Sequence, residues 1–257
     1  VLERIAEFGE KQQALKNKIQ AALTYPAFMA VIGTAIIILL MTYVVPNITE
    51  VFEEMDRALP WTTQLLISLS NILKTYWWGI LFMMLVITLF LQYFFSIPKG
   101  KSFADMVKLK LPTIGPIIRK AALARFASTL GNLLRSGVDL ITALKIVKET
   151  LNNIHLTSVI DTTIDEVNRG KSMTASLGSS PWFPPMFIQM IQVGEQSGEL
   201  ETMLEDVSRA YEREVETAVM KLSSLIEPIM ILIMGLSVLY IVLSILLPIF
   251  EMNQITG

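Results

Sequence analysis

The sequence contains no cysteine and a single histidine, His155, among its 257 residues. Without cysteine there is no disulfide bond, no thiolate nucleophile and no cysteine-ligated metal. With one histidine we expect neither a histidine-based metal site nor a Ser/His/Asp triad, and a lone histidine near a helix start is typically structural. The sequence therefore predicts no catalytic residue, no metal site and no cofactor.

Charged residues are also scarce. They make up 17% of the chain, the net charge is −2, and there is no basic tail, which argues against a nucleic-acid-binding protein. Hydrophobic residues make up 53%, which is more than soluble domains usually carry. This composition predicts an integral membrane protein.

Three long runs lack Asp, Glu, Lys, Arg and His altogether: residues 27–46, 76–97 and 228–250. At a rise of about 1.5 Å per residue, a helix of this length crosses the roughly 30 Å hydrocarbon core of a bilayer. A charge at mid-membrane costs about 2.5 to 3.5 kcal/mol and is tolerated where ions or protons move. The runs therefore predict three transmembrane helices and argue against a pump or proton-coupled transporter.

The stretch 198–250 joins two kinds of helix. In its first half, apolar residues such as Leu204 and Tyr211 recur at helical spacing opposite a charged face. After Glu227 and Pro228 the charges stop for the rest of the stretch. We expect one rod, bent or restarted at Pro228, that joins a water-facing domain to a membrane.

The only long hydrophilic section is 98–227, and its punctuation predicts several short helices. Asp139 and Ser172 are expected N-caps, while Gly137 and Gly170 are expected to close the preceding helices. The GEQSGEL segment lacks a following Lys-Ser or Lys-Thr, so it predicts a tight interhelical turn rather than a phosphate-binding loop, with partner contact as its second role. No stretch has strand periodicity, which predicts an all-helical bundle.

Lysine and arginine flank the expected spans unevenly. They are frequent before residue 27, after residue 97 and before residue 228, whereas the connector 47–75 holds only Arg57 and Lys74 and the tail 251–257 holds none. Cytoplasmic loops carry the excess of Lys and Arg. We therefore expect the N-terminus and the section 98–227 to be cytoplasmic, and three spans then place the C-terminus on the other side of the membrane.

The N-terminal part also aligns with the stretch 198–250 when it is shifted by 202 positions. The matched pairs include Pro26 with Pro228, Gly33 with Gly235, and Pro46 with Pro248. The shared order of amphipathic helix, proline, span and proline predicts an internal duplication. The first copy would have had its own helical domain, so we expect further sequence upstream of Val1.

Three segments carry a resemblance to a known family: ARFASTLGNLLRSGVDLITALKIV, FPPMFIQMIQVGEQSGELETMLEDVSRAYE, and EPIMILIMG with LLPIFEMNQ. They resemble the inner-membrane platform proteins of type II secretion systems and type IV pili, and the resemblance covers essentially the whole chain. The resemblance implies two copies of a six-helix cytoplasmic domain, of which the first is missing here, and three transmembrane helices. LLPIFEMNQI and SSPWFPPMFIQMI are more similar to the secretion branch than to the pilus branch.

The resemblance implies a machine part of the bacterial inner membrane rather than an enzyme. It implies that the protein passes the motion of a cytoplasmic secretion ATPase to pseudopilins, beside other inner-membrane platform proteins and membrane lipid. Exposed apolar rims also predict a homo-oligomer. The alternatives are the same role in type IV pilus assembly, a small transporter, and a membrane-anchored signalling adaptor.

Several polar residues have both a structural and a functional interpretation. Glu50, Glu53 and Glu54 suit a divalent cation, although acidic loop residues are usually just solvated. Glu227 would pair with the terminal amine of a pseudopilin if it faced the bilayer edge, and is otherwise interfacial. Polar residues of the spans either pack helices together or line a groove for a pseudopilin: Thr34, Thr42, Thr88, Gln92, Ser237, Tyr240 and Ser244, with Gly33 and Gly235 allowing close approach.

These features predict an all-α membrane protein with three transmembrane helices and a cytoplasmic helical bundle, which the resemblance implies is of the six-helix type. The expected parts are an amphipathic helix that ends the first repeat (1–26), a first span (27–46), a periplasmic connector (47–75), a second span (76–97), the cytoplasmic helical domain (98–227), a third span (228–250) and a periplasmic tail (251–257).

Overall fold

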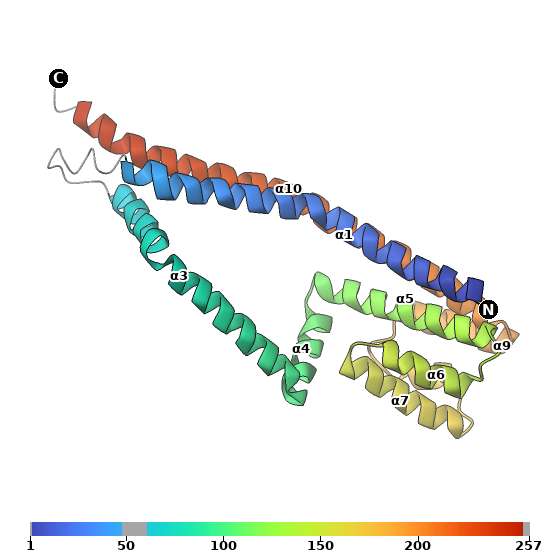
Figure 1. Cartoon of the computed structure of the whole chain (residues 1–257). Helices are drawn as coiled ribbons and strands as arrows, with labels where there is room; N and C mark the ends of the chain where they lie inside the picture. The colour runs from blue at the N-terminus through green and yellow to red at the C-terminus, as the bar shows by residue number, and fades with distance from the viewer. Residues whose placement is uncertain (1, 48–60, 254–257) are drawn as a thin grey trace. The chain divides into compact units, whose positions relative to one another are not determined.

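The structure is a computed structural model that describes residues 2–47 and 61–253, and every regular element in these ranges is helical (Figure 1). The elements are α1 (Leu2–Leu39), the π-helix η1 (Leu40–Val44), α3 (Trp61–Ser96), α4 (Pro98–Lys110), α5 (Ile114–Arg135), α6 (Leu140–Thr150), α7 (Ile154–Asn168), α8 (Met173–Gly178), α9 (Pro185–Ser197) and α10 (Leu200–Asn253). The prediction of an all-α fold is confirmed.

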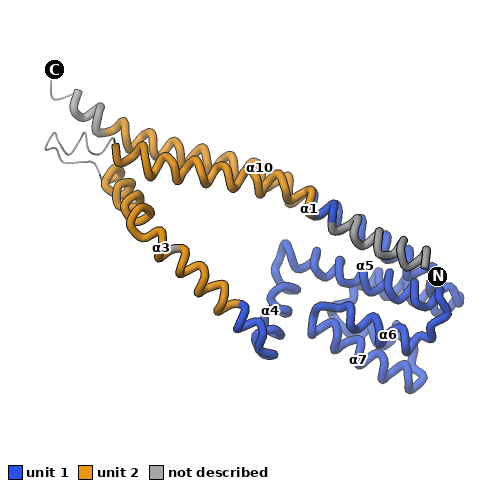
Figure 2. The backbone as a smooth tube through the Cα atoms, viewed as in Figure 1, with its two compact units in different colours: residues 1–19, 92–220 blue, residues 20–91, 221–257 orange. Residues whose placement is uncertain are grey.

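The chain folds as two compact units (Figure 2). Unit 1 comprises residues 1–19 and 92–220, and unit 2 comprises residues 20–91 and 221–257. The unit boundaries lie inside helices, so α1, α3 and α10 each contribute residues to both units.

Unit 1 has a closely packed core to which α5, α6, α7, α8, α9 and the first half of α10 all contribute buried side chains. At its centre, the ring of Phe187 lies 5.5 Å from Phe183, 6.1 Å from Phe126 and 5.9 Å from Tyr211. These separations are within the 4.5 to 7 Å range that aromatic pairs favour. The same burial raises the pKa of the Tyr211 phenol, because the charged form loses its hydration.

The expected helix ends of unit 1 are confirmed. Asp139 and Ser172 each accept a hydrogen bond from the backbone N–H three residues later, at 2.9 and 3.1 Å. Gly137 and Gly170 follow α5 and α7 with φ values of 84° and 83°, a conformation that side chains with a Cβ rarely adopt. These short-range signals were sufficient because capping depends on residues within one turn.

Unit 2 has a smaller core where α1 with η1, the start of α3, and α10 meet. Met41, Val45, Leu66 and Ile241 are all buried there. Leu66 lies in residues 61–75, which the sequence suggested were connector but which are helical here and form the first turns of α3. The sequence did not predict that Leu66 is buried in this core, because the polar residues around it lower the mean hydropathy of the segment.

Pro26 and Pro228 do not end their helices. α1 continues through Pro26 to Leu39, and α10 continues through Pro228 to Asn253. The helix start expected at Pro26 is therefore absent, because a proline removes one backbone hydrogen bond and the turns on either side can still close.

Among the described residues, two helical stretches are long and apolar enough to cross a membrane, Asn17–Asn47 and Leu200–Leu247. A third would be present if Trp61–Gly79 and Leu81–Ser96 form one span, although they are bent by 54°. Within α3 the bend coincides with Tyr76, whose φ of −108° and ψ of 16° are not helical.

Candidate functional site: helix α10 and its polar contacts

The first half of α10 is fixed to α5 along its length. Leu204, Val207, Tyr211 and Val215 are buried, which places one apolar stripe at helical spacing against the unit 1 core. Gly131 of α5 lies opposite, where an added Cβ would be 3.2 Å from the Leu204 Cβ. The two helices therefore cross at a contact that favours glycine.

Polar contacts on both sides of this stripe hold the same two helices together. Arg135 of α5 pairs with Glu205, and Lys120 pairs with Glu214. Within the core, the Ser208 hydroxyl donates a 3.0 Å hydrogen bond to the Ala124 carbonyl. The buried hydrogen bond contributes more than the exposed ion pairs, which are screened by water.

The GEQSGEL segment forms the tight turn between α9 and α10 that the sequence predicted. Gly198 adopts a left-handed φ of 72°, and the Glu199 N–H donates to the Gly194 carbonyl at 3.1 Å. An added Cβ on Gly194 would lie 2.9 Å from the Leu200 Cα, so only glycine fits the close approach of the two helices.

Glu195 within this turn has a structural role that the sequence did not indicate. Its carboxylate accepts hydrogen bonds from the backbone N–H groups of Met173, at 2.8 Å, and of Thr174, at 3.3 Å, and also from the Thr174 hydroxyl. These N–H groups lie in the first turn of α8 and lack helical partners. Glu195 therefore ties the α9–α10 turn to the start of α8.

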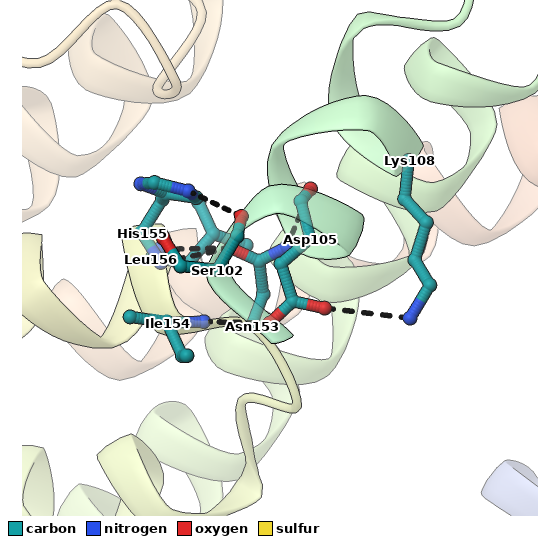
Figure 3. Close-up of polar contacts among 7 residues, drawn as sticks. All are labelled: Ser102, Asp105, Lys108, Asn153, Ile154, His155 and Leu156. Carbon is teal, nitrogen blue, oxygen red and sulfur yellow. Dashed lines mark hydrogen bonds and ion pairs between the residues drawn. The ribbon is translucent and has the colours of Figure 1, made fainter. Parts of the chain in front are cut away.

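A second polar cluster joins α4 to the start of α7 (Figure 3). The Asp105 carboxylate, which is 2% exposed, accepts from the Ile154 N–H at 3.1 Å and from Lys108 at 3.3 Å. The Asn153 side chain donates to the Asp105 carbonyl at 3.2 Å and accepts from the His155 N–H at 3.0 Å. The cluster closes the α7 N-terminus, where the helix dipole favours the carboxylate.

His155 has a structural contact. Its Nε2 lies 3.1 Å from the Ser102 carbonyl oxygen. A shallow pocket of about 340 Å³ beside it is lined by Ser158, Thr162, Ser176 and Trp182 among others, and no carboxylate is among the lining residues that the structure describes. Among these lining residues, His155 is a possible base for a hydroxyl, but there is no carboxylate to orient it as a Ser/His/Asp triad requires.

The polar residues of unit 2 fall into two groups. The Tyr240 hydroxyl donates across helices to the Thr62 carbonyl at 3.1 Å, as expected for an interhelical hydrogen bond. Thr42, Thr88 and Ser237 instead donate to carbonyls four residues earlier in their own helices. The hydrogen bonds of these three hydroxyls therefore lie within single helices and do not join one helix to another.

Two further interhelical hydrogen bonds involve residues that the sequence assigned to the connector. The buried Thr63 hydroxyl donates to the Ser244 carbonyl at 2.6 Å, and the buried Ser70 hydroxyl donates to the Met41 carbonyl. Sequence reasoning missed both, because hydroxyl residues in a polar stretch resemble solvated loop residues. The position of Met41 inside the π-helix was equally invisible in the sequence.

The glycines and Glu227 can also be placed. An added Cβ on Gly33 would overlap the Met234 side chain, which confirms a close approach there, whereas one on Gly235 would meet nothing within 4 Å. Glu227 is exposed, and its Oε1 lies 3.5 Å from the Tyr25 hydroxyl.

Glu50, Glu53 and Glu54, for which the sequence suggested a divalent cation, lie outside the described residues. Elsewhere in the described chain, no three acidic or histidine side chains form a metal-binding group.

A family model and individual known proteins both match this chain. The family described as "Type II secretion system (T2SS), protein F" matches residues 1–46 and 126–248. The chain is 38% identical over 260 residues to type II secretion system protein F of Pseudomonas aeruginosa, covering 100% of this chain and 64% of that protein.

Proteins of pilus assembly are similarly close. The chain is 35% identical over 252 residues to type IV pilus assembly protein PilC of Thermus thermophilus, covering 98% of this chain and 62% of the relative. PilC of Pseudomonas aeruginosa is 33% identical over 258 residues, covering 100% of this chain and 69% of the relative. The chain thus spans somewhat less than two thirds of the first two relatives.

Proposed function

Because the chain belongs to the type II secretion system protein F family, we propose that it is an inner-membrane platform component of a type II secretion system. In this role it couples a cytoplasmic secretion ATPase to the extraction and assembly of pseudopilins, alongside other platform proteins. The chain acts by transmitting movement and not by catalysing a reaction. Family membership favours this role over a small transporter or a signalling adaptor.

The observation that carries the proposal is the continuity of α10. One helix contains both the buried stripe of unit 1, from Leu204 to Val215, and the uncharged residues 228–247. Consecutive backbone hydrogen bonds make a helix stiff along its axis. A displacement of the unit 1 helices by a soluble partner would therefore be passed along the chain into the membrane.

The proposal includes three spans, at 27–46, 76–97 and 228–250, with the N-terminus cytoplasmic and the C-terminus periplasmic. Two candidate spans and the bent α3 pair support the number of spans, and the distribution of Lys and Arg supports the orientation. We also propose that the two proline-containing helices derive from a duplication. We further propose a homo-oligomer, in which some of the exposed apolar side chains of α3 contact a second copy instead of lipid.

The same role in type IV pilus assembly is the second candidate. It is favoured by the PilC relatives, whose 33% and 35% identities are near the 38% of the secretion protein. The two candidates differ in their ATPase and in the subunits that they assemble, so a binding comparison separates them.

The test is to reconstitute the full chain in lipid nanodiscs and titrate it with a purified secretion ATPase hexamer and, in parallel, with a pilus ATPase hexamer. Binding and ATP hydrolysis are both measured. Selective binding of the secretion ATPase supports the proposal, and selective binding of the pilus ATPase supports the second candidate. Binding of neither contradicts a direct contact between this chain and an ATPase.

A further inference from the structure

α4 has an apolar face that no other described element covers. Phe103, Met106 and Val107 are 63%, 37% and 40% exposed, and their spacing places them on one side of the helix. Gly100, Ala104 and Leu109 of the same helix are buried. The buried residues account for how α4 packs into unit 1, whereas most of Phe103 and part of Met106 and Val107 remain uncovered.

The charge on the exposed surface of α4 is entirely positive. The helix carries Lys99, Lys101, Lys108 and Lys110, and its one acidic residue, Asp105, is buried and committed to the α7 N-terminus. Lys99 and Lys110 lie at helical spacing from Phe103 and Met106, so they share the apolar face. A face that combines apolar side chains with lysines suits a partner whose surface is anionic and whose interior is apolar.

The position of α4 in the chain limits what that partner is. α3 ends at Ser96 and α4 begins at Pro98, with only the extended Ile97 between them. The last part of α3, Leu81–Ser96, is one half of a candidate membrane span. The start of α4 is therefore within a few residues of a strongly apolar helix.

A tight corner fixes this arrangement. Gly100 is buried, and a Cβ on it would overlap the carbonyl oxygen of Phe94 in the last turns of α3. The Lys101 N–H also donates to the Ile97 carbonyl at 2.9 Å, which starts the helix directly after the turn. α4 is thus held against the end of α3 by contacts that leave its apolar face free.

We propose that α4 is an interfacial helix that binds anionic phospholipid. Phe103, Met106 and Val107 enter the boundary between headgroups and acyl chains, while Lys99 and Lys110 extend to the phosphates above them. Amphipathic helices with a basic rim bind membranes in this way, and long lysine side chains reach the headgroups while their stems stay apolar. This lipid contact goes beyond the proposed function, which does not require it.

The absence of cysteine from the sequence allows a direct test on the full chain in nanodiscs. Met106→Cys is labelled with the polarity-sensitive fluorophore NBD, and Ile146→Cys on α6, where the side chain is 43% exposed, is the matched control. Emission and quenching by spin-labelled lipid are compared in phosphatidylcholine and in a mixture with about 30% phosphatidylglycerol, an anionic lipid.

The label at position 106 is expected to shift to shorter wavelength and to be quenched by spin-labelled lipid, more strongly in the anionic mixture. The label at position 146 is expected to remain in water in both. Adding Lys99→Gln and Lys110→Gln should reduce the effect of anionic lipid at position 106 several-fold, whereas Lys145→Gln on α6 should not change it.

Two results would overturn the proposal. One is a label at position 106 that behaves like the label at 146. The other is a label that is shielded from water but not quenched by lipid, which would mean that protein covers this face. Nanodiscs that hold a single chain identify which protein surface covers the face. If a second copy of the chain covers it, the shielding of the label disappears in these nanodiscs. Neither result affects ATPase binding, so the proposed function is tested separately.

Discussion

The hydroxyl of Tyr25 in α1 lies 3.5 Å from Oε1 of Glu227 in α10, and the two residues are 202 positions apart. This separation equals the shift that aligns the two proline-containing segments in the sequence. The Ser223 hydroxyl likewise donates to the Ala22 carbonyl, 201 positions away, at 2.6 Å. Within unit 2 the two helices therefore run parallel, with matched residues side by side.

This pairing predicts different effects for the two matched glycines of unit 2. Gly33→Leu should destabilise unit 2 by about 1 to 3 kcal/mol, because the new side chain overlaps Met234 and overpacked sites cost energy in this range. Gly235→Leu should not destabilise unit 2, since an added Cβ there meets nothing within 4 Å and a glycine inside a helix is itself unfavourable. Thermal unfolding of the full chain in nanodiscs measures both.

Met234→Ala provides the control for this prediction. If Gly33→Leu acts by overlapping Met234, then the double variant should recover most of the loss. Equal loss in the Gly33 and Gly235 variants would mean that α1 and α10 do not pack in this register.

The buried stripe of α10 predicts a second effect. Leu204→Ala should cost about 2 to 5 kcal/mol, because it leaves a cavity at a side chain that is 0% exposed. Leu204→Asp together with Tyr211→Asp should prevent unit 1 from folding and abolish secretion in cells. Val193→Asp on α9, where the side chain is 55% exposed, should leave both intact. Normal secretion with both α10 changes would contradict the coupling proposal.

Glu195 gives a third prediction. Glu195→Gln should cost about 1 to 2 kcal/mol, since an amide has one acceptor oxygen in place of the two that receive Met173 and Thr174. Glu199→Gln, at an exposed position four residues later, should be nearly neutral. Urea unfolding followed by circular dichroism compares the two variants. Equal midpoints would mean that Glu195 does not stabilise α8.

A fourth prediction concerns pH. The backbone hydrogen bond from Thr142 lowers the pKa of Asp139 below its ordinary value, so the folded chain favours the charged form. The stabilisation by Asp139 is therefore present at neutral pH and is lost as the pH falls through the pKa of the folded state.

The variant Asp139→Ala isolates this effect. It should be less stable than the original chain at about pH 7, and the difference should shrink as the pH falls through the lowered pKa that Asp139 has in the folded chain. A difference that does not change with pH would show that the carboxylate charge does not contribute to the cap.

Local sequence signals determined where helices end and which helices are apolar. Asp139, Ser172, Gly137 and Gly170 fixed helix ends, because a cap depends on neighbours within one turn. The uncharged runs predicted apolar helices, since a hydrocarbon environment tolerates few charges. The resemblance, together with these patterns, also led to the family.

Tertiary structure decided what joins distant parts of the chain. Glu195 with α8, Asp105 with α7, and Ser70 with η1 are contacts between segments whose pairing leaves no periodic signal. α1 continues through Pro26, where the sequence suggested a helix boundary, and α10 continues through Pro228 as the expected single rod. The loss of one backbone hydrogen bond at each proline does not stop the adjacent turns from forming. The exposed face of α4 likewise emerged only when the rest of unit 1 was packed, since sequence shows which residues are apolar but not which remain uncovered.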